Sequence, residues 1–314
     1  MPHIASWIGD EIKALEGKYK RYKKDDKLSY HFDFASSRSI ADMMAFQRSL
    51  EDLTAVKYQA VIAHSLFTQI FCEFDAFMGS LLSALYKSKP DLYKSLDRKI
   101  SISELRAYGD IHAATDAMLA AEIDTFRRSS YVDQFALLET RFGIILKKFP
   151  EWGEFAELAQ RRNLLTHNGG TVNEQYRVMC AREGNSAGSN APVGSRLSID
   201  PDYFSRALFI MRKVAFMLSH TLWRKVLPAD AATAHEACHS TIYDLLQKKM
   251  WRIAADLGEF SLLPVMCKNL SDQHRRMRVV NTAIGYKFAK KPSECERILD
   301  AEDWSSSYRD FRLA

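Results

Sequence analysis

The sequence predicts an all-α protein. Over several long segments, apolar residues recur every three or four positions, which is the period of a helix buried on one face. The strict alternation of apolar and polar residues that marks a strand is almost absent, with residues 196–199 as the one short exception. We therefore expect a helical bundle up to about residue 227 and a smaller helical unit after it.

Length, charge and cysteine usage limit the class of protein. The chain has 314 residues, 47% of them hydrophobic, which is enough to bury a core in one large helical domain or two small ones. Basic residues exceed acidic ones by 44 to 39, a mild excess that permits binding to a polyanion without requiring it. The five cysteines form no Cys-x-x-Cys pair, which argues against a disulfide framework or a zinc knuckle and indicates a reducing compartment.

No segment has the pattern of a signal peptide or of a membrane span. The first residues lack a basic stretch followed by an apolar one. The two most apolar stretches, residues 66–86 and 207–223, are both interrupted by charged side chains. We expect a cytoplasmic protein without a membrane partner.

Residues 1–50 are expected to form a short helix, over residues 4–15, and then a basic arm. Six positive charges and two tyrosines lie within the ten residues of Lys18-Tyr-Lys-Arg-Tyr-Lys-Lys-Asp-Asp-Lys27. Such a run can hold RNA by neutralising phosphates and stacking bases. A solvated helix face or a mobile arm is the alternative interpretation. The candidate RNA-binding residues of the arm are Lys18, Lys20, Arg21, Lys23 and Lys24.

Residues 51–227 are expected to form one helical domain. A long helix over residues 53–86 carries phenylalanines and leucines at helical spacing, which marks a core face. Further helices are expected near 113–128, 131–148 and 201–225, the last of them begun by Asp200-Pro201. Residues 183–194 are rich in Gly, Ser and Asn and are expected to be a loop, either a mobile substrate contact or a plain insertion.

Residues 228–314 are expected to form the smaller unit. Helical segments are expected at about 229–257, 272–290 and 293–299, with a further start at residue 307. Their spacing vaguely resembles that of tetratricopeptide-type hairpins, although no strict period is present. The last residues carry no capping signal, so we expect the array to continue beyond this chain.

The best candidate for chemistry is the end of a helix that starts at Pro150. Arg162, Asn163 and His167 lie near that end. Asn163 and His167 are four residues apart and share a helix face, and Arg162 is long enough to reach it. The following Gly169-Gly170 supplies a left-handed cap, so the imidazole is expected at an accessible tip.

These residue types suit RNA cleavage without a metal. The ribose 2′-hydroxyl attacks the adjacent phosphate, which requires a base, an acid and positive charge. His167 can act as base or acid near neutral pH, Arg162 can clamp phosphate oxygens, and Asn163 can orient the phosphate or the imidazole. The neighbouring Arg161 either steers phosphate or forms a surface salt bridge. Because one chain offers one such histidine, a two-fold dimer in which two tips meet is the simplest complete site.

The spacing Arg-polar-x-x-x-His, followed by Asn-Gly-Gly and by Asn173-x-x-Tyr176, resembles the signature of the HEPN superfamily. From about residue 67 to 176 the order of features is similar to one HEPN branch: Phe-Asp-Ala-Phe on a long helix, Lys-Pro, Ile-Ser-Ile-Ser-Glu, Glu-Ile-Asp-x-Phe-Arg-Arg, then Trp and Arg-Arg-Asn-Leu. The resemblance implies a HEPN-like bundle and a metal-independent endoribonuclease without a cofactor, often a toxin or antiviral-defence protein. The expected partners are RNA, a second copy of the chain, and a regulatory protein.

Two other functions stay open. Some HEPN proteins have lost cleavage, so a non-catalytic module that binds RNA, a nucleotide or a protein is the first alternative. The second is a zinc hydrolase, because His235-Glu-Ala-Cys-His239 is a literal His-Glu-x-x-His with Glu259 as a possible third ligand. We place the zinc set His235, His239 and Glu259 below the ribonuclease, since its flanks lack the apolar seam that buries such a helix in metalloproteases.

Overall fold

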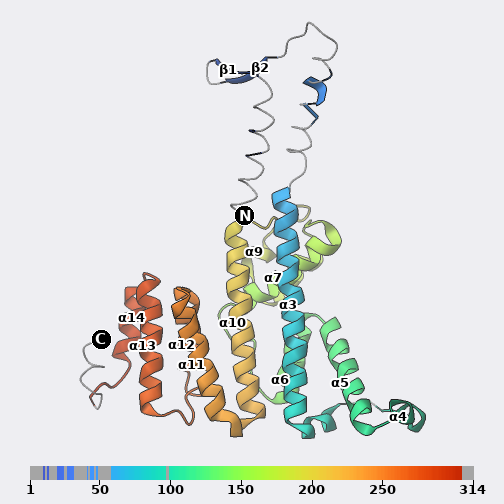
Figure 1. Ribbon diagram of the computed structural model, residues 1–314, viewed down its shortest axis with the longest axis vertical. Coiled ribbons are helices and arrows are strands. Elements are labelled where there is room, and N and C mark those ends of the chain that lie inside the picture. The colour runs from blue at the N-terminus through green and yellow to red at the C-terminus, as the bar shows by residue number, and fades with distance from the viewer. Residues whose placement is uncertain are drawn as a thin grey trace. The chain divides into compact units, whose positions relative to one another are not determined.

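A computed structural model describes residues 58–96 and 99–305 and, before them, residues 10, 13, 20–24, 27–31, 41, 43–45, 47 and 48. The chain forms two compact units, one of residues 1–68 with 198–200 and one of residues 69–197 with 201–314. The described part is predominantly helical (Figure 1), which confirms the all-α fold.

The first unit contains a two-stranded hairpin, which the sequence did not predict. Strand β1 (Lys20–Lys24) pairs antiparallel with β2 (Lys27–His31), with Lys24 opposite Lys27. The basic run is therefore extended over residues 20–24, where we expected a helix face or an arm. Tyrosines in both segments and two aspartates between them are hairpin signals in the sequence. The high lysine content, which is unusual for a strand, obscured them.

Helices make up most of the remaining described chain. They are α3 (Tyr58–Ser88), the 3-10 turn η1 (Pro90–Ser95), α4 (Ile102–Tyr108), α5 (Ile111–Arg128), α6 (Tyr131–Phe142), α7 (Trp152–Asn168), α8 (Glu174–Arg182), α9 (Ser186–Ser189), α10 (Pro201–Val226), the 3-10 turn η2 (Pro228–Asp230), α11 (Ala231–Gln247), α12 (Trp251–Ser261), α13 (Asp272–Phe288) and α14 (Pro292–Asp300). Helix α3 begins in the first unit and continues into the second. None of the helices in the described ranges is long and apolar enough to cross a membrane.

An aromatic core joins α3, α6 and α7 within the second unit. The ring of Phe74 on α3 lies 5.6 Å from that of Tyr131 on α6 and 5.8 Å from that of Phe155 on α7, measured between centroids. Phe135 of α6 lies 5.2 Å from Phe155. Phe74 belongs to the helical stripe that marks a core face in the sequence, and the contact area and ring geometry of the four aromatic residues stabilise the packing of these helices. The core thereby fixes α7, the helix with the candidate site.

Two helices end earlier than predicted. The helix expected over residues 229–257 is divided into α11 and α12. Lys249, between them, has a φ of 57°, and this left-handed conformation interrupts the helix. Helix α6 ends at Phe142, where we expected it to reach residue 148, since Gly143 takes the left-handed conformation that caps a helix. In both places a single backbone conformation overrides continuous helical spacing.

The segment 183–194 is locally folded, although its composition predicts a loop. Asn185 caps the short helix α9 by accepting a hydrogen bond from the amide of Gly188 at 2.6 Å. A Cβ atom at Gly188 would lie 2.5 Å from Sγ of Cys180, so glycine permits the close approach of α9 to α8. Beside this segment, Thr171 and Arg196 form an isolated antiparallel bridge, near the strand signal at residues 196–199.

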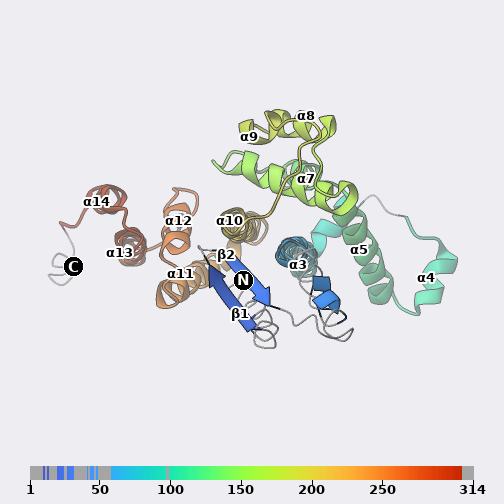
Figure 2. The same ribbon diagram turned by 90° about the horizontal axis from the view of Figure 1, so that it is seen from above.

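Helices α12 and α13 lie side by side (Figure 2). They approach closely at Gly258. A Cβ atom there would lie 2.2 Å from Oγ1 of Thr282, which is fully buried. We expect Gly258→Ala to lower the free energy of unfolding by about 1–3 kcal/mol, because an overpacked core must shift. The control is Gly79→Ala on α3, whose Cβ would meet Ile123 at an ordinary 3.4 Å and should leave stability equal or higher. Denaturant unfolding measures both, and equal stability of the two variants would contradict close packing at Gly258.

The buried His220 of α10 makes stability depend on pH. Its ring lies 4.4 Å from that of Phe216 and is 5% exposed. Burial, reinforced by the charge of Arg224, lowers the pKa of His220 to about 4. Histidine in an unfolded chain titrates near pH 6.5, so the unfolded state binds more protons between about pH 4 and 6.5. The neutral ring therefore contributes stability above pH 6.5 that is lost as the pH falls.

We expect His220→Phe to reduce the loss of stability between about pH 7 and 4.5 by about 2 kcal/mol, because the substituted ring takes up no proton. Urea unfolding of both proteins at the two pH values measures the difference. An equal loss in the variant and in the wild-type chain would show that the ring of His220 is solvated.

Candidate functional site

The candidate site lies at the carboxyl end of α7. Gly169 adopts the left-handed conformation, with φ 56° and ψ 24°, and the amide of Gly170 donates to the carbonyl of Leu164 at 3.0 Å. This is the predicted glycine cap, which satisfies carbonyls that the helix end leaves free. Asn163 and His167 are both exposed at this tip.

Arg162 connects the tip to the core. It is half-buried, and its Nη1 donates to Oδ1 of Asn163 at 3.1 Å, while its Nε is buried without a hydrogen-bond partner. Among the described residues no carboxylate forms an ion pair with Arg162. The positive charge of Arg162 influences Tyr131. The hydroxyl of Tyr131 donates to Asp75 at 2.6 Å. Burial and then Asp75 raise the pKa of Tyr131, and Arg162 opposes that shift. The guanidinium therefore retains donors for an anion.

A buried network around Glu157 holds α7 in place. Glu157 is 5% exposed, and its two oxygens accept from the hydroxyl groups of Tyr176 on α8 and Tyr203 on α10, each at 2.6 Å. Nε of Arg161 also donates to Glu157, at 2.7 Å, and its guanidinium lies 3.8 Å from the ring centroid of Tyr203. Because three elements converge on one carboxylate, the orientation of α7 is fixed about three turns before its carboxyl end.

Arg161 thus forms a salt bridge, one of the two roles expected for it, but in a largely buried setting and not on the surface. Its side chain is 16% exposed, against 6% for Glu157. The charge of Glu157 raises the pKa of Arg161, although desolvation acts in the opposite direction as the largest single effect. The guanidinium group of Arg161 therefore stabilises α7, and little of its side chain is exposed.

Asn173 and Tyr176, the second part of the resemblance, have local structural roles. The side chain of Asn173 caps α8 by accepting from the amide of Tyr176 at 2.9 Å. The hydroxyl of Tyr176 is the group that donates to Glu157. The spacing Asn-x-x-Tyr therefore begins α8 and ties it to α7.

The predicted RNA-binding residues of the basic run belong to the other unit. Lys20, Arg21, Lys23 and Lys24 lie on strand β1, and Lys18 lies outside the described residues.

The residues of the zinc alternative are engaged in other contacts. His235 is buried, and its Nε2 lies 3.0 Å from the carbonyl of Lys268 while its Nδ1 lies 2.8 Å from a guanidinium nitrogen of Arg278. Glu259 accepts from Tyr286 and Arg297. Over the described ranges, no three His, Cys, Asp or Glu side chains are grouped so that they would hold a metal ion. The structure therefore does not assemble His235, His239 and Glu259 into one site.

Two cavities of the second unit, of 810 and 380 Å³, are lined by other residues and include none of Arg162, Asn163 and His167. The exposed residues of the candidate site, Asn163 and His167, lie at a helix end. Sequence reasoning did not single out Glu157 or recognise the larger cavity, although it considered Glu259, which lines that cavity, as a zinc ligand. The available signal for Glu157 was its position four residues before Arg161, which is typical of an ion pair along a helix.

No protein-family model, curated protein or solved structure matches this chain significantly. The HEPN resemblance therefore rests on the sequence features given above.

Proposed function

We propose that this chain is a metal-independent endoribonuclease, acting as a toxin or antiviral-defence effector, with Arg162, Asn163 and His167 as its catalytic residues. The observation that carries the proposal is an exposed imidazole at a capped helix end, close in the chain to a guanidinium without an acidic partner in the described ranges. The HEPN resemblance supplies the reaction class and the biological role.

The reaction assigns one task to each residue. His167 takes the proton of the ribose 2′-hydroxyl, whose oxygen bonds to the adjacent phosphorus. The bond from phosphorus to the 5′-oxygen breaks, and an acid donates a proton to that oxygen. Arg162 stabilises the negative charge of the phosphorane, and Asn163 orients the phosphate. The products are a 2′,3′-cyclic phosphate and a free 5′-hydroxyl, so the nucleophile comes from the RNA.

A second copy of the chain completes this site. The reaction uses a base and an acid, whereas one tip offers one imidazole. Asn163 and His167 are exposed at the end of α7, as a site shared by two tips requires. We infer a two-fold homodimer in which each copy contributes one His167 and one Arg162.

The basic residues of the first unit are the proposed RNA-binding residues. Lys20, Arg21, Lys23 and Lys24, with Lys18 before them, can neutralise phosphates, and this attraction should weaken as salt increases. We place the protein in the cytoplasm because its cysteines are free over the described ranges. A toxin of this kind also requires a regulatory partner that restrains it.

The test is a cleavage assay with the full chain and a short single-stranded RNA, with and without EDTA. We expect equal cleavage in both and products with 2′,3′-cyclic phosphate ends, identified by mass spectrometry. The matched RNA with a single 2′-deoxyribose at the cleaved position should stay intact there. Loss of cleavage in EDTA would contradict the mechanism, and RNA binding without cleavage would favour the non-catalytic module.

A further inference from the structure

The larger cavity of the second unit is apolar inside. Its volume is 810 Å³, within the range of about 300–1,000 Å³ that is typical of small-molecule sites. Helices α10 and α12, the connection between α6 and α7, and residues 263–269 form its walls. The apolar lining includes Val214, Met217, Leu218, Phe260, Leu263 and Met266.

Apolar side chains of the cavity lining are also exposed to solvent. Ile145 is 67% exposed, Val265 is 68% exposed and Leu263 is 46% exposed, and all three line the cavity. Exposed apolar groups that gather at a concave surface mark a place where an apolar ligand binds. The body of the ligand should therefore be apolar.

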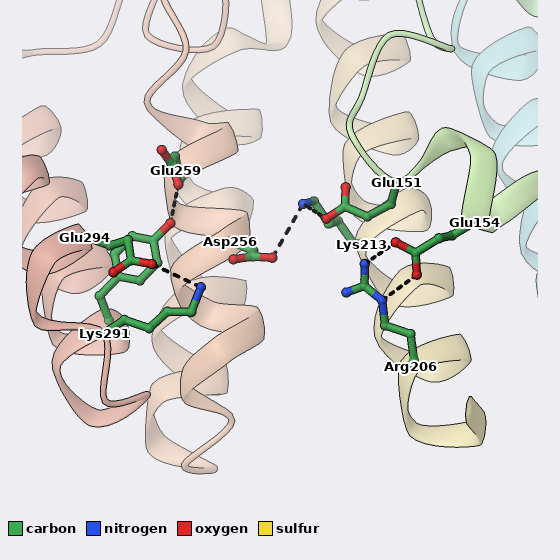
Figure 3. Close-up of polar contacts among 9 residues, drawn as sticks. Glu151, Glu154, Arg206, Lys213, Asp256, Glu259, Lys291 and Glu294 are labelled. Atoms are coloured by element: carbon green, nitrogen blue, oxygen red, sulfur yellow. Dashed lines mark hydrogen bonds and ion pairs between the residues drawn. The ribbon is translucent and has the colours of Figure 1, made fainter. Parts of the chain in front are cut away.

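The charged lining is predominantly basic. Five of its residues are basic, Lys148, Lys213, Arg224, Lys225 and Lys268, and two are acidic, Asp256 and Glu259. Both acids already have partners. Asp256 lies 3.5 Å from Nζ of Lys213 (Figure 3). Glu259 accepts from Tyr286 and Arg297. Over the described ranges, Lys148, Arg224, Lys225 and Lys268 form no ion pair with an acidic side chain. The cavity therefore presents uncompensated positive charge.

Arg224 is the basic residue that most needs an anion. Its Nη2 lies 2.8 Å from Nδ1 of His235, and Nη2 of Arg278 lies 2.8 Å from the same nitrogen. Nε2 of His235 faces the carbonyl of Lys268, so that nitrogen carries the proton and Nδ1 offers one lone pair to two guanidinium groups. Arg278 is 1% exposed, and Nε of Arg224 is buried without an acceptor.

The cluster of Arg224, His235 and Arg278 destabilises the fold when no anion is bound. Burial, then the charge of Arg278, lowers the pKa of Arg224, and burial also lowers that of His235. Two cations share a neutral acceptor and no carboxylate, and buried charge without compensation destabilises a fold. An anion beside Arg224 would compensate the charge and supply the missing acceptors.

We propose that the cavity binds a small amphipathic anion, with an aliphatic or aromatic body among the apolar residues and one carboxylate or phosphate head at Arg224. The site is separate from the proposed ribonuclease site, since it includes none of Arg162, Asn163 and His167. Its test is therefore independent of whether the chain cleaves RNA.

Isothermal titration calorimetry with the full chain tests the proposal, using probes below the concentration at which they form micelles. Dodecanoate and dodecyl phosphate compare the two head groups, dodecanol has the tail without the charge, and acetate has the charge without the tail. We expect one dodecanoate or one dodecyl phosphate per chain, at least tenfold weaker binding of dodecanol, and no binding of acetate. No binding of either anion, or equal affinity for dodecanol, would overturn the proposal.

Variants locate the head group. Arg224→Gln should weaken dodecanoate binding by about tenfold to a hundredfold, the effect of losing a hydrogen bond to a charged group. The matched control is Arg212→Gln, an exposed residue of the same helix that does not line the cavity, and it should bind as the wild type does. Equal losses in both variants would overturn the assignment.

A second pair of variants applies even if Arg224→Gln fails to fold. Val265 is exposed at the cavity, so both Val265→Asp and Val265→Lys should preserve the fold. Both remove apolar contact, but only the aspartate repels an anion. Dodecanoate should bind more weakly to Val265→Asp than to Val265→Lys, and the reverse order would contradict an anionic ligand.

Discussion

The variant His167→Ala is expected to cleave RNA about two to four orders of magnitude more slowly than the wild-type chain, which is the range for loss of a general acid–base group. Arg162→Ala should show a similar loss, because the phosphorane would lack its charge-stabilising donor. RNA binding should remain, since other basic residues hold the phosphates. Initial rates of cleavage at equal protein concentration measure the effect, with a filter-binding assay for RNA affinity.

The matched control for this loss is His112→Ala. His112 is also exposed and lies on another helix, α5. His112→Ala therefore removes the same side chain as His167→Ala but leaves the tip of α7 unchanged. Stability should change by less than about 1 kcal/mol in both histidine variants, as is usual for exposed side chains. Unchanged cleavage by His167→Ala would remove His167 from the mechanism.

The proposed shared site also predicts the activity of dimers that contain one His167→Ala chain. A heterodimer of wild-type chain with His167→Ala should be impaired, because it holds one imidazole where the reaction uses two. Mixing His167→Ala with Arg162→Ala should not restore a site with both histidines and both arginines. Full activity of a preparation that light scattering shows to be monomeric at the assay concentration would contradict the composite site, even if both residues were essential.

Local sequence signals predicted the end of α7 and part of the core. They did not predict the contacts between residues that are far apart in the chain. The cap at Gly169 follows from glycine chemistry alone, and the aromatic core at Phe74 follows from helical spacing. The break at Lys249 could not be predicted, because lysine has no preference for a left-handed conformation and tertiary packing imposes it. The hairpin over residues 20–31 was missed because pairing between strands outweighs the weak strand propensity of lysine.

In the candidate site, too, the sequence predicted the local features and not those that depend on tertiary contacts. The exposure of His167 and Asn163 is consistent with their place beside a helix-ending glycine. The burial of Glu157 and Arg161 was not predictable, since an ion pair at this spacing usually lies on a helix surface. What buries it is the arrival of Tyr176 and Tyr203 from α8 and α10, which depends on the tertiary fold. The same holds for Arg224 and Arg278, which are 54 residues apart and meet only through His235.

The largest loss of stability is expected from Glu157→Gln. The substitution preserves shape but removes the charge that compensates the largely buried Arg161, and it replaces one of the two oxygens that accept from Tyr176 and Tyr203. Removing one partner of a buried ion pair typically costs about 3–5 kcal/mol, because the other charge stays buried without compensation. We expect a loss of that size in the free energy of unfolding, measured by denaturant titration.

The matched control is Glu174→Gln, which removes the same charge from α8. Glu174 pairs with Arg177 at 3.2 Å, and its side chain is 68% exposed, so water replaces the lost partner and the cost should be about 0–1 kcal/mol. If Glu157→Gln were no more destabilising than Glu174→Gln, the buried carboxylate would not be what fixes α7, and the orientation of its carboxyl end would depend on the aromatic core.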